Sequence, residues 1–338
     1  MKFEREETFR RNENLERLLK EINGILEPVE DRIIEGYGMP KYPVIFVVAM
    51  SRCGSTLMMQ WLANTGRFAY PTNLLSRFYE APYIGAKIQQ LLTAPEFNFR
   101  GEILDFNSDI SFTSDIGKTK GALAPNEFWY FWRRFLPNTE AETDYMDKQC
   151  LKEAKCKEFA AELAAVEAVF NKPLAMKGHI LRFNIPFLSS ILEKALFVFV
   201  TRHPFYNIQS VLETRVRYYG DRRAWVGAKP RELHMLQALD PFEQVAGQVY
   251  FTNRAIEEGL GQIDAARGLR VSYEEFCTAP EQVFNQITEK FSQQEYGVNW
   301  SYTGPEQFQS TNQVRLPRGD CKRIIDAYKS FSGMDITP

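Results

Sequence analysis

The 338-residue chain lacks a long hydrophobic run, paired cysteines and an excess of charge of one sign. Its longest apolar stretch, Val44–Met50, is far shorter than the roughly 20 residues that cross a bilayer. The charged segment Met1–Arg11 lacks the apolar core of a secretory signal. We therefore expect a cytoplasmic protein without a membrane span.

Cysteine usage and charge exclude further classes. The five cysteines are odd in number and contain no Cys-x-x-Cys pair, so neither a disulfide framework nor a zinc knuckle is expected. With 41 basic and 43 acidic residues, the formal charge of −2 gives no global field for nucleic acid. Asp105, Asn107 and Asp109 begin like a calcium loop, but Ile110 replaces its glycine. We therefore expect no metal site and no nucleic-acid partner.

The composition is that of a globular protein, with 44% hydrophobic and 25% charged residues. From Phe9 to Leu26 the apolar residues recur at helical spacing, and we expect Pro28 to end this helix. Residues 1–40 are therefore interpreted as an N-terminal helical extension.

Short apolar runs then alternate with helical patterns. Val44–Val48 predicts a strand buried on both faces, and Leu196–Val200 predicts a second strand, which leads into a helix opened by Pro204. Briefer strands are expected at Leu174–Met176 and Leu269–Tyr273. The alternation predicts an α/β fold with a doubly wound parallel sheet flanked by helices.

The stretch 67–171 interrupts this alternation, because it is aromatic and irregular. No internal repeat or low-complexity linker separates it from the rest of the chain. We therefore interpret residues 1–338 as a single domain in which 67–171 is an insertion.

Polar residues follow the predicted strands. Gly54, Ser55 and Thr56 connect the first strand to its helix and offer N–H groups and hydroxyls to an anionic oxygen, and Arg52 adds a charge. The other strand ends and the following helix carry Lys177, His179, Arg202 and Ser210. Because the carboxyl ends of parallel strands share one edge of a sheet, we expect a single anion-binding cleft there.

Several interpretations of this loop stay open. A structural turn with a surface arginine is the simplest of them. A Walker A loop is disfavoured because Ala49 stands at its first glycine and no lysine follows Gly54. No arginine follows Cys53 at the spacing of a tyrosine-phosphatase loop. A P-loop-type small-molecule kinase and a non-catalytic nucleotide-binding protein are two further candidates for the function of the chain.

From about residue 42 to residue 328 the ordered motifs resemble the sulfotransferases that use 3′-phosphoadenosine 5′-phosphosulfate (PAPS). Ser51–Leu57 is similar to the loop that binds the 5′-phosphosulfate. Phe199–Pro204 together with Ser210 resembles the 3′-phosphate motif, and Lys177–His179 resembles the Lys-x-His segment that supplies the catalytic base in cytosolic members. Tyr273 opens a segment similar to the one whose tyrosine approaches the adenine.

Other positions indicate a branch of this family. Arg52 stands where cytosolic members have lysine, and Leu57 where they have tryptophan, so the chain resembles the bacterial and carbohydrate-type branch. The base in that branch can be a glutamate, which makes Glu80 and Glu127 rivals of His179. Arg318-Gly319 loosely resembles the C-terminal phosphate-binding segment of the family.

The resemblance implies a P-loop-like fold and sulfuryl transfer from PAPS to a hydroxyl or amine of a small-molecule or glycan acceptor. Adenosine 3′,5′-bisphosphate (PAP) would be the product, no metal would be required, and the insertion would form the acceptor side. His179 would take the proton of the acceptor, while Lys177 and Arg52 would stabilise the leaving oxygen. The implied donor-binding residues are Arg52, Cys53, Gly54, Ser55, Thr56, Arg202, Ser210, Tyr273, Arg318 and Gly319. We expect the acceptor to be a specialised metabolite or a glycan.

Overall fold

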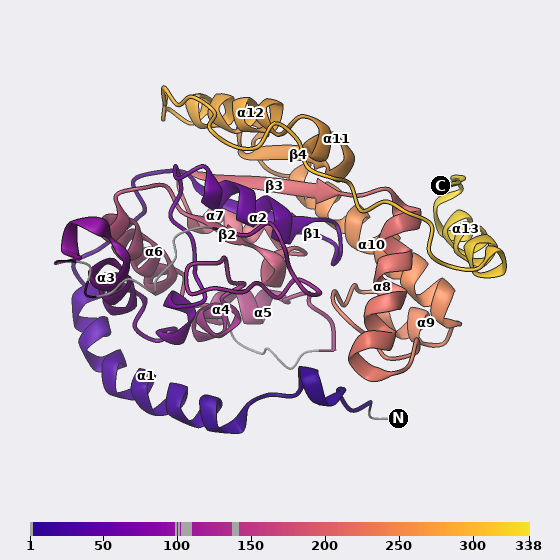
Figure 1. Cartoon of the computed structure of the whole chain (residues 1–338), viewed down its shortest axis with the longest axis horizontal. Helices are drawn as coiled ribbons and strands as arrows, with labels where there is room; N and C mark the ends of the chain where they lie inside the picture. The colour runs from indigo at the N-terminus through magenta and orange to yellow at the C-terminus, as the bar shows by residue number, and fades with distance from the viewer. Residues whose placement is uncertain (1–2, 99, 101, 103–109, 137–141) are drawn as a thin grey trace.

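The computed structural model describes residues 3–98, 100, 102, 110–136 and 142–338. Within them, parallel strands form one sheet in the order β2-β1-β3-β4 (Figure 1). The strands are Val44–Ala49 (β1), Ala175–Lys177 (β2), Ala195–Thr201 (β3) and Gly268–Ser272 (β4). Because all neighbours run in the same direction, their carboxyl ends reach one edge of the sheet.

Helices cover both faces of this sheet. Every residue of β1 is buried, and its alternate side chains face two separate hydrophobic cores. One core includes helices Ser55–Asn64 (α2), Pro204–Tyr219 (α8), Pro241–Leu260 (α10) and Pro280–Gln293 (α12). The other includes Trp129–Phe135 (α4), Cys156–Phe170 (α6) and Ile185–Ile191 (α7). The predicted α/β fold with a helix-flanked parallel sheet is confirmed.

Further helices and turns complete the described chain. The remaining α-helices besides the N-terminal one are Pro82–Thr93 (α3), Lys148–Glu153 (α5), Leu233–Gln237 (α9), Tyr273–Thr278 (α11) and Arg318–Ser332 (α13). The 3₁₀ turns are Glu7–Phe9, Leu75–Arg77, Pro95–Phe97, His179–Leu181 and Ala265–Arg267. The stretch 67–171 therefore holds α3 to α6, of which α6 packs in the core beneath the sheet.

The N-terminal helix α1, Glu13–Ile34, corrects one prediction, because Pro28 lies inside it rather than at its end. Pro28 removes the backbone bond to Gly24, but both residues are exposed, so water can solvate the released carbonyl. Beyond Pro28, Glu30 is buried and accepts backbone N–H groups at the start of α3. This packing stabilises the last turns against the cost of the proline.

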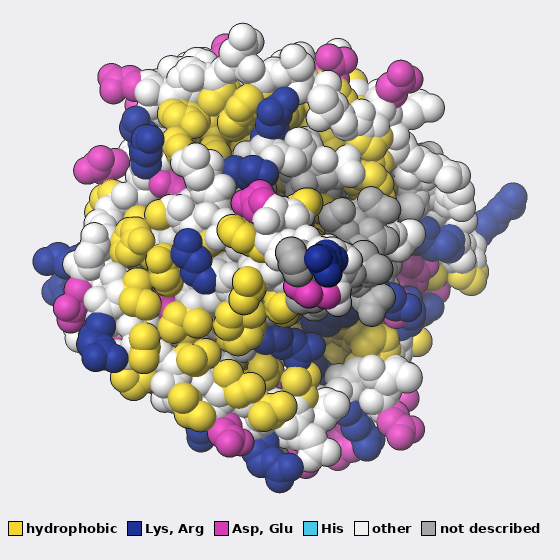
Figure 2. Space-filling view, turned by 60° about the vertical axis from the view of Figure 1, so that its left-hand side comes forward, with side chains coloured by type: hydrophobic (Ala, Val, Ile, Leu, Met, Phe, Trp, Pro, Cys, Tyr) yellow, Lys and Arg dark blue, Asp and Glu magenta, His cyan; other side chains and the backbone are white. Residues whose placement is uncertain are grey.

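The molecular surface carries both signs of charge. Figure 2 shows Lys and Arg side chains interspersed with Asp and Glu among hydrophobic patches on one face, in agreement with the small net charge. In the part of the chain that the structure describes, no helix is long and apolar enough to cross a membrane. No group of three His, Cys, Asp or Glu suited to a metal ion lies within the same residues. Asp105, Asn107 and Asp109 are outside them.

Candidate active site

The loop after β1 has an unusual backbone. Arg52 and Gly54 both adopt left-handed conformations, with φ of 70° and 89°. A Cβ on Gly54 would lie 2.4 Å from the ring of Tyr273, so glycine is needed for the tyrosine to lie against the loop. Ser55 and Thr56 then begin α2, where helix N–H groups lack intrahelical partners. The loop thus combines free N–H groups, hydroxyls and an aromatic ring.

The side chain of Cys53 does not take part in this surface. It is fully buried in the hydrophobic core, and burial raises the pKa of its thiol to about 12. The thiol therefore stays protonated and is unsuited to nucleophilic chemistry. Only the backbone of Cys53 is suited to the predicted phosphate contact.

Lys177 connects the end of β2 to this loop. Its ammonium group donates to Thr56 Oγ1 and to Glu127 Oε1, each over 2.9 Å, and the side chain is only 5% exposed. Glu127 Oε2 also accepts the Trp129 indole N–H over 2.6 Å. Burial would raise the pKa of Glu127, but the charge of Lys177 and these hydrogen bonds outweigh it and lower the pKa. Glu127 is therefore ionised and neutralises Lys177.

His179 lies two residues after Lys177, the last residue of β2. Its Nε2 is 3.2 Å from Ser55 Oγ, and its Nδ1 has no hydrogen-bond partner among the described residues. Burial lowers the pKa of His179 well below its ordinary value, and Arg182 and Lys177 act in the same direction. The imidazole is therefore neutral at pH 7 and retains a lone pair that can accept a proton.

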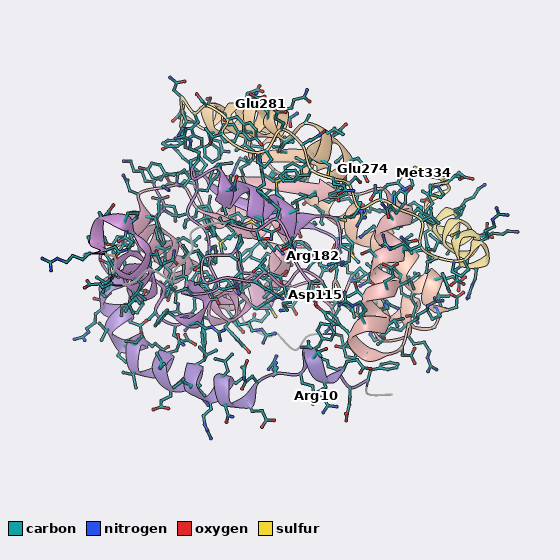
Figure 3. All side chains as sticks on the ribbon, in the orientation of Figure 1. Arg10, Asp115, Arg182, Glu274, Glu281 and Met334 are labelled. Carbon is teal, nitrogen blue, oxygen red and sulfur yellow. The ribbon has the colours of Figure 1, made fainter. Side chains whose placement is uncertain are left out.

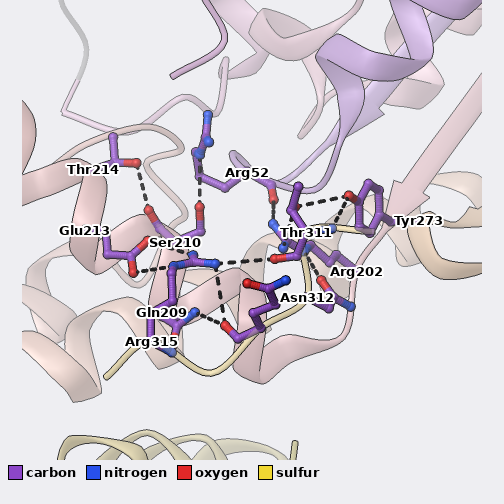
Figure 4. Close-up of polar contacts among 11 residues, drawn as sticks. Arg52, Arg202, Gln209, Ser210, Glu213, Thr214, Tyr273, Thr311, Asn312 and Arg315 are labelled. Atoms are coloured by element: carbon purple, nitrogen blue, oxygen red, sulfur yellow. Dashed lines mark hydrogen bonds and ion pairs between the residues drawn. The ribbon is translucent and has the colours of Figure 1, made fainter. Parts of the chain in front are cut away.

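Two arginines, Arg52 and Arg202, form the other half of the candidate site (Figure 4). We call them, together with Lys177, His179 and the loop after β1, the cluster. Arg52 donates to Ser210 Oγ over 3.1 Å, and the buried Arg202 donates to the backbone oxygen of Arg52 over 3.0 Å. Within the described residues, no carboxylate lies at ion-pair distance from either guanidinium. Burial and the nearby charge of Arg202 lower the pKa of Arg52. A half-buried and a buried cation without a carboxylate partner among the described residues make a site suited to a multiply charged anion.

A C-terminal segment contributes residues that sequence reasoning missed. Arg202 donates to Asn312 Oδ1 and Thr311 Oγ1, and the Thr311 N–H donates to the Tyr273 hydroxyl (Figure 4). Arg315 then reaches back to α8, where its N–H donates to Gln209 Oε1. These residues lie in an irregular segment without periodicity, and their one sequence signal is the nearby basic motif at Arg318-Gly319.

Arg318 and Gly319 themselves lie elsewhere. They are exposed at the start of α13, which packs against α10 and α8 (Figure 1). The structure does not bring them into the hydrogen-bonded cluster, whereas it brings Arg315 beside it. Their assignment to phosphate binding stays a prediction. Arg315, whose guanidinium pairs with Glu213 on α8 over 2.7 Å, is the cation nearer to the cluster.

The two rival carboxylates are also separated. Glu127 forms an ion pair with Lys177, whereas Glu80 forms an ion pair with Arg134 over 2.7 Å. Arg134 also binds the buried Glu162 over 2.9 Å. The structure therefore brings Glu127, but not Glu80, to the cluster that holds Lys177 and His179.

Comparison with known proteins decides the family. A model of the sulfotransferase family matches residues 43–294, which include β1 to β4 and the loops of the cluster. The chain belongs to the sulfotransferase family. A search of curated protein sequences gives no match.

The chain is similar to solved sulfotransferases, and STF1 shares its fold. Sulfotransferase STF1 from Mycobacterium tuberculosis has 12% identity and a TM-score of 0.52, covering 91% of this chain and 82% of its own. STF9 from Mycobacterium avium has 14% identity and a TM-score of 0.49, with coverage of 89% and 71%. The sulfotransferase domain of the Synechococcus olefin synthase has 17% identity and a TM-score of 0.43, with coverage of 89% and 98%. At these identities the likeness concerns the fold alone.

Proposed function

We propose that this sulfotransferase moves the sulfuryl group of PAPS to a hydroxyl or amine of a small-molecule or glycan acceptor in the cytoplasm. The observation that carries the proposal is the pair of arginines, the half-buried Arg52 and the buried Arg202, beside a glycine-containing helix start. An anion with two separate phosphate groups fits this distribution of cations better than a single phosphate does. PAPS carries a 3′-phosphate and a 5′-phosphosulfate.

The cluster divides naturally between the two ends of such a donor. Arg202 and Ser210, with Arg315 nearby, are suited to the 3′-phosphate. Ser55, Thr56 and the N–H groups of the loop are suited to the 5′-phosphate, as at other helix N-termini. Tyr273 lies between them against Gly54, where it can contact the adenine.

The residues around the 5′ end have the charges that sulfuryl transfer requires. Bound PAPS would supply the sulfuryl group and a phosphate leaving group, and Lys177 and Arg52 would stabilise the negative charge on the leaving oxygen. His179 would accept the proton of the acceptor. Its neutral imidazole lies 3.2 Å from the hydroxyl of Ser55, at the start of α2, where the 5′-phosphate is assigned. Glu127 is a rival base, but its ion pair with Lys177 favours a role in neutralising that lysine.

The remaining features of the proposal concern the acceptor side. We assign it to the insertion 67–171, which supplies Glu127 and the partly exposed Trp129 beside Lys177. We also propose that residues 1–338 form a single domain, that the reaction needs no metal and that the protein serves specialised metabolism.

Calorimetric titration of the purified protein with PAP, ADP and ATP plus magnesium tests the donor. We expect PAP to bind at least tenfold more tightly than ADP, because hydrogen bonds to a charged phosphate contribute roughly 1.5–3 kcal/mol. Selective binding of ATP with magnesium would instead support the kinase alternative. Equal binding of PAP and ADP would refute a dedicated 3′-phosphate site.

A further inference from the structure

A tight turn in the insertion has a strained backbone. Asp115 and Lys118 exchange two backbone hydrogen bonds of 2.9 and 2.8 Å across a two-residue turn. Ile116 and Gly117 both have positive φ, 47° and 81°, which is the pattern of a type I′ turn. Asn-Gly is the preferred sequence there, and a β-branched isoleucine is strained in this region. The turn is therefore held in place by contacts rather than by its own conformational preference.

The base of the turn is fixed to α2. Gln60, which is 1% exposed, donates to the backbone oxygens of Ser111 and Thr113 over 2.8 Å each. Phe112 packs edge-on against Phe308 with ring centroids 5.1 Å apart. These hydrogen bonds and this ring contact keep the base of the turn beside the helix that follows the phosphate loop.

The tip of the turn lies over the start of α2. A Cβ on Gly117 would be 3.4 Å from Thr56 Oγ1, the hydroxyl that Lys177 also binds. Asp115, which Figure 3 labels near the middle of the view, lies at ion-pair distance from α8. The tip therefore lies beside the place where the proposed function puts the reacting sulfuryl group.

The links from the tip to α8 are weak by comparison. Asp115 pairs with Arg217 over 2.9 Å, but these side chains are 54% and 55% exposed. The Tyr218 hydroxyl donates to the Ile116 backbone oxygen over 3.4 Å, near the limit of a hydrogen bond. The same helix carries Ser210, which binds Arg52. The turn thus bridges the helices that carry the two halves of the site, with a firm attachment on α2 and a loose one on α8.

We propose that the turn Asp115–Lys118 shields the reacting sulfuryl group from water, and that Arg217 and Tyr218 hold it closed. The proposal rests on the proposed function. Without the shield, a water molecule attacks sulfur, the bond from sulfur to the bridging phosphate oxygen breaks, and PAP, sulfate and a proton are released. Arg217 and Tyr218 are thus positioning residues that favour transfer to the acceptor over hydrolysis.

Hydrolysis of PAPS without an acceptor tests the shield, and it requires no knowledge of the acceptor. Arg217→Gln should raise the rate of sulfate release about threefold, as expected for loss of a half-exposed ion pair. Ile116→Asn should lower that rate about threefold, because asparagine relieves the strain at the turn. Arg223→Gln is the matched control, since it breaks an exposed ion pair with Asp221 in the loop after α8.

A double variant tests whether the effect passes through the pair. Asp115→Asn combined with Arg217→Gln should release sulfate no faster than either single variant. Additive effects, or equal hydrolysis by Arg217→Gln, Ile116→Asn and the wild type, would overturn the shield even if all the proteins bind PAP. A wild-type protein that binds no PAP would overturn the proposed function and the shield with it.

Discussion

Two clusters in this molecule differ in the groups that their arginine side chains bind. At the sheet edge, Arg52 and Arg202 donate to neutral hydroxyl, amide and backbone acceptors. Between the helices of the insertion and α1, Arg134 instead binds two carboxyl groups, those of Glu80 and Glu162. Burying a charge without an opposite charge is costly, so the first arrangement is expected where a ligand supplies the missing charge. The second cluster holds a counter-charge for Arg134 in Glu80 and is best understood as structural.

The largest expected effect tests the cluster at the sheet edge. Lys177→Met keeps the apolar stem but removes the ammonium group beside Thr56 and Glu127. We expect the rate of PAP formation from PAPS to fall roughly 10²–10³-fold, as when one preorganised donor to a developing oxyanion is removed. Quench-flow measurement of PAP under single-turnover conditions checks this. A loss of less than tenfold would exclude Lys177 from leaving-group stabilisation.

The choice of base sharpens the comparison between the clusters. His179→Ala should lower turnover by roughly 10²-fold while PAP affinity stays nearly unchanged, because the imidazole is assigned to the proton and not to the donor. Glu80→Gln should have little effect, since Glu80 binds Arg134 instead. Steady-state kinetics of both variants decide the assignment, and a larger loss in Glu80→Gln than in His179→Ala would reverse it.

A third prediction concerns the discrimination between nucleotides. Arg202→Ala should weaken PAP binding at least tenfold and ADP binding much less, because only PAP has the 3′-phosphate. Arg254→Ala is the control, since its exposed ion pair with Glu258 lies outside the hydrogen-bonded cluster. Isothermal titration of both variants measures these affinities. An unchanged ratio of the two affinities in Arg202→Ala would remove Arg202 from the phosphate site.

The smallest effect concerns the structural cluster. Burial raises the pKa of Glu162 to about 8, beside Glu30 and despite Arg134. The folded state thus binds a proton that the unfolded state has lost above about pH 4.5. The free energy of unfolding should therefore decrease as the pH rises to about 8 and then level off. Urea denaturation at several pH values checks this slope.

Glu162→Gln provides the comparison for that slope. Glutamine has a similar shape and cannot lose a proton, so the variant should lose part of the decrease in stability between pH 5 and 8. Glu258→Gln, at an exposed ion pair on α10, is the control. A wild-type slope that persists in Glu162→Gln would show that other groups titrate in this range.

Much of the fold is encoded locally in the sequence. The apolar, β-branched runs of β1 and β3 predict their strands within one residue, because both are buried on both faces. The end of α1 could not be predicted, since it depends on the distant contact of Glu30 with α3. A proline is a local signal, and here tertiary packing overrides it.

The site was predictable only where side chains directly follow strands. Lys177, His179 and Arg202 lie at strand ends, so topology alone places them at one edge. Arg315 comes from an irregular segment that follows no strand. The motif that resembles the family's phosphate-binding segment, Arg318-Gly319, begins three residues further along the chain. The choice of Glu127 over Glu80 depends on how the insertion folds, which no periodic pattern specifies.

The most direct test of the central claim uses radiolabelled PAPS and a panel of alcohols, amines and glycans, with Lys177→Met as the blank. We predict that the wild-type protein transfers the labelled sulfuryl group to at least one acceptor and that the variant does not. If the wild-type protein binds PAP but moves the label neither to an acceptor nor to water, the sheet edge binds a nucleotide without catalysing transfer.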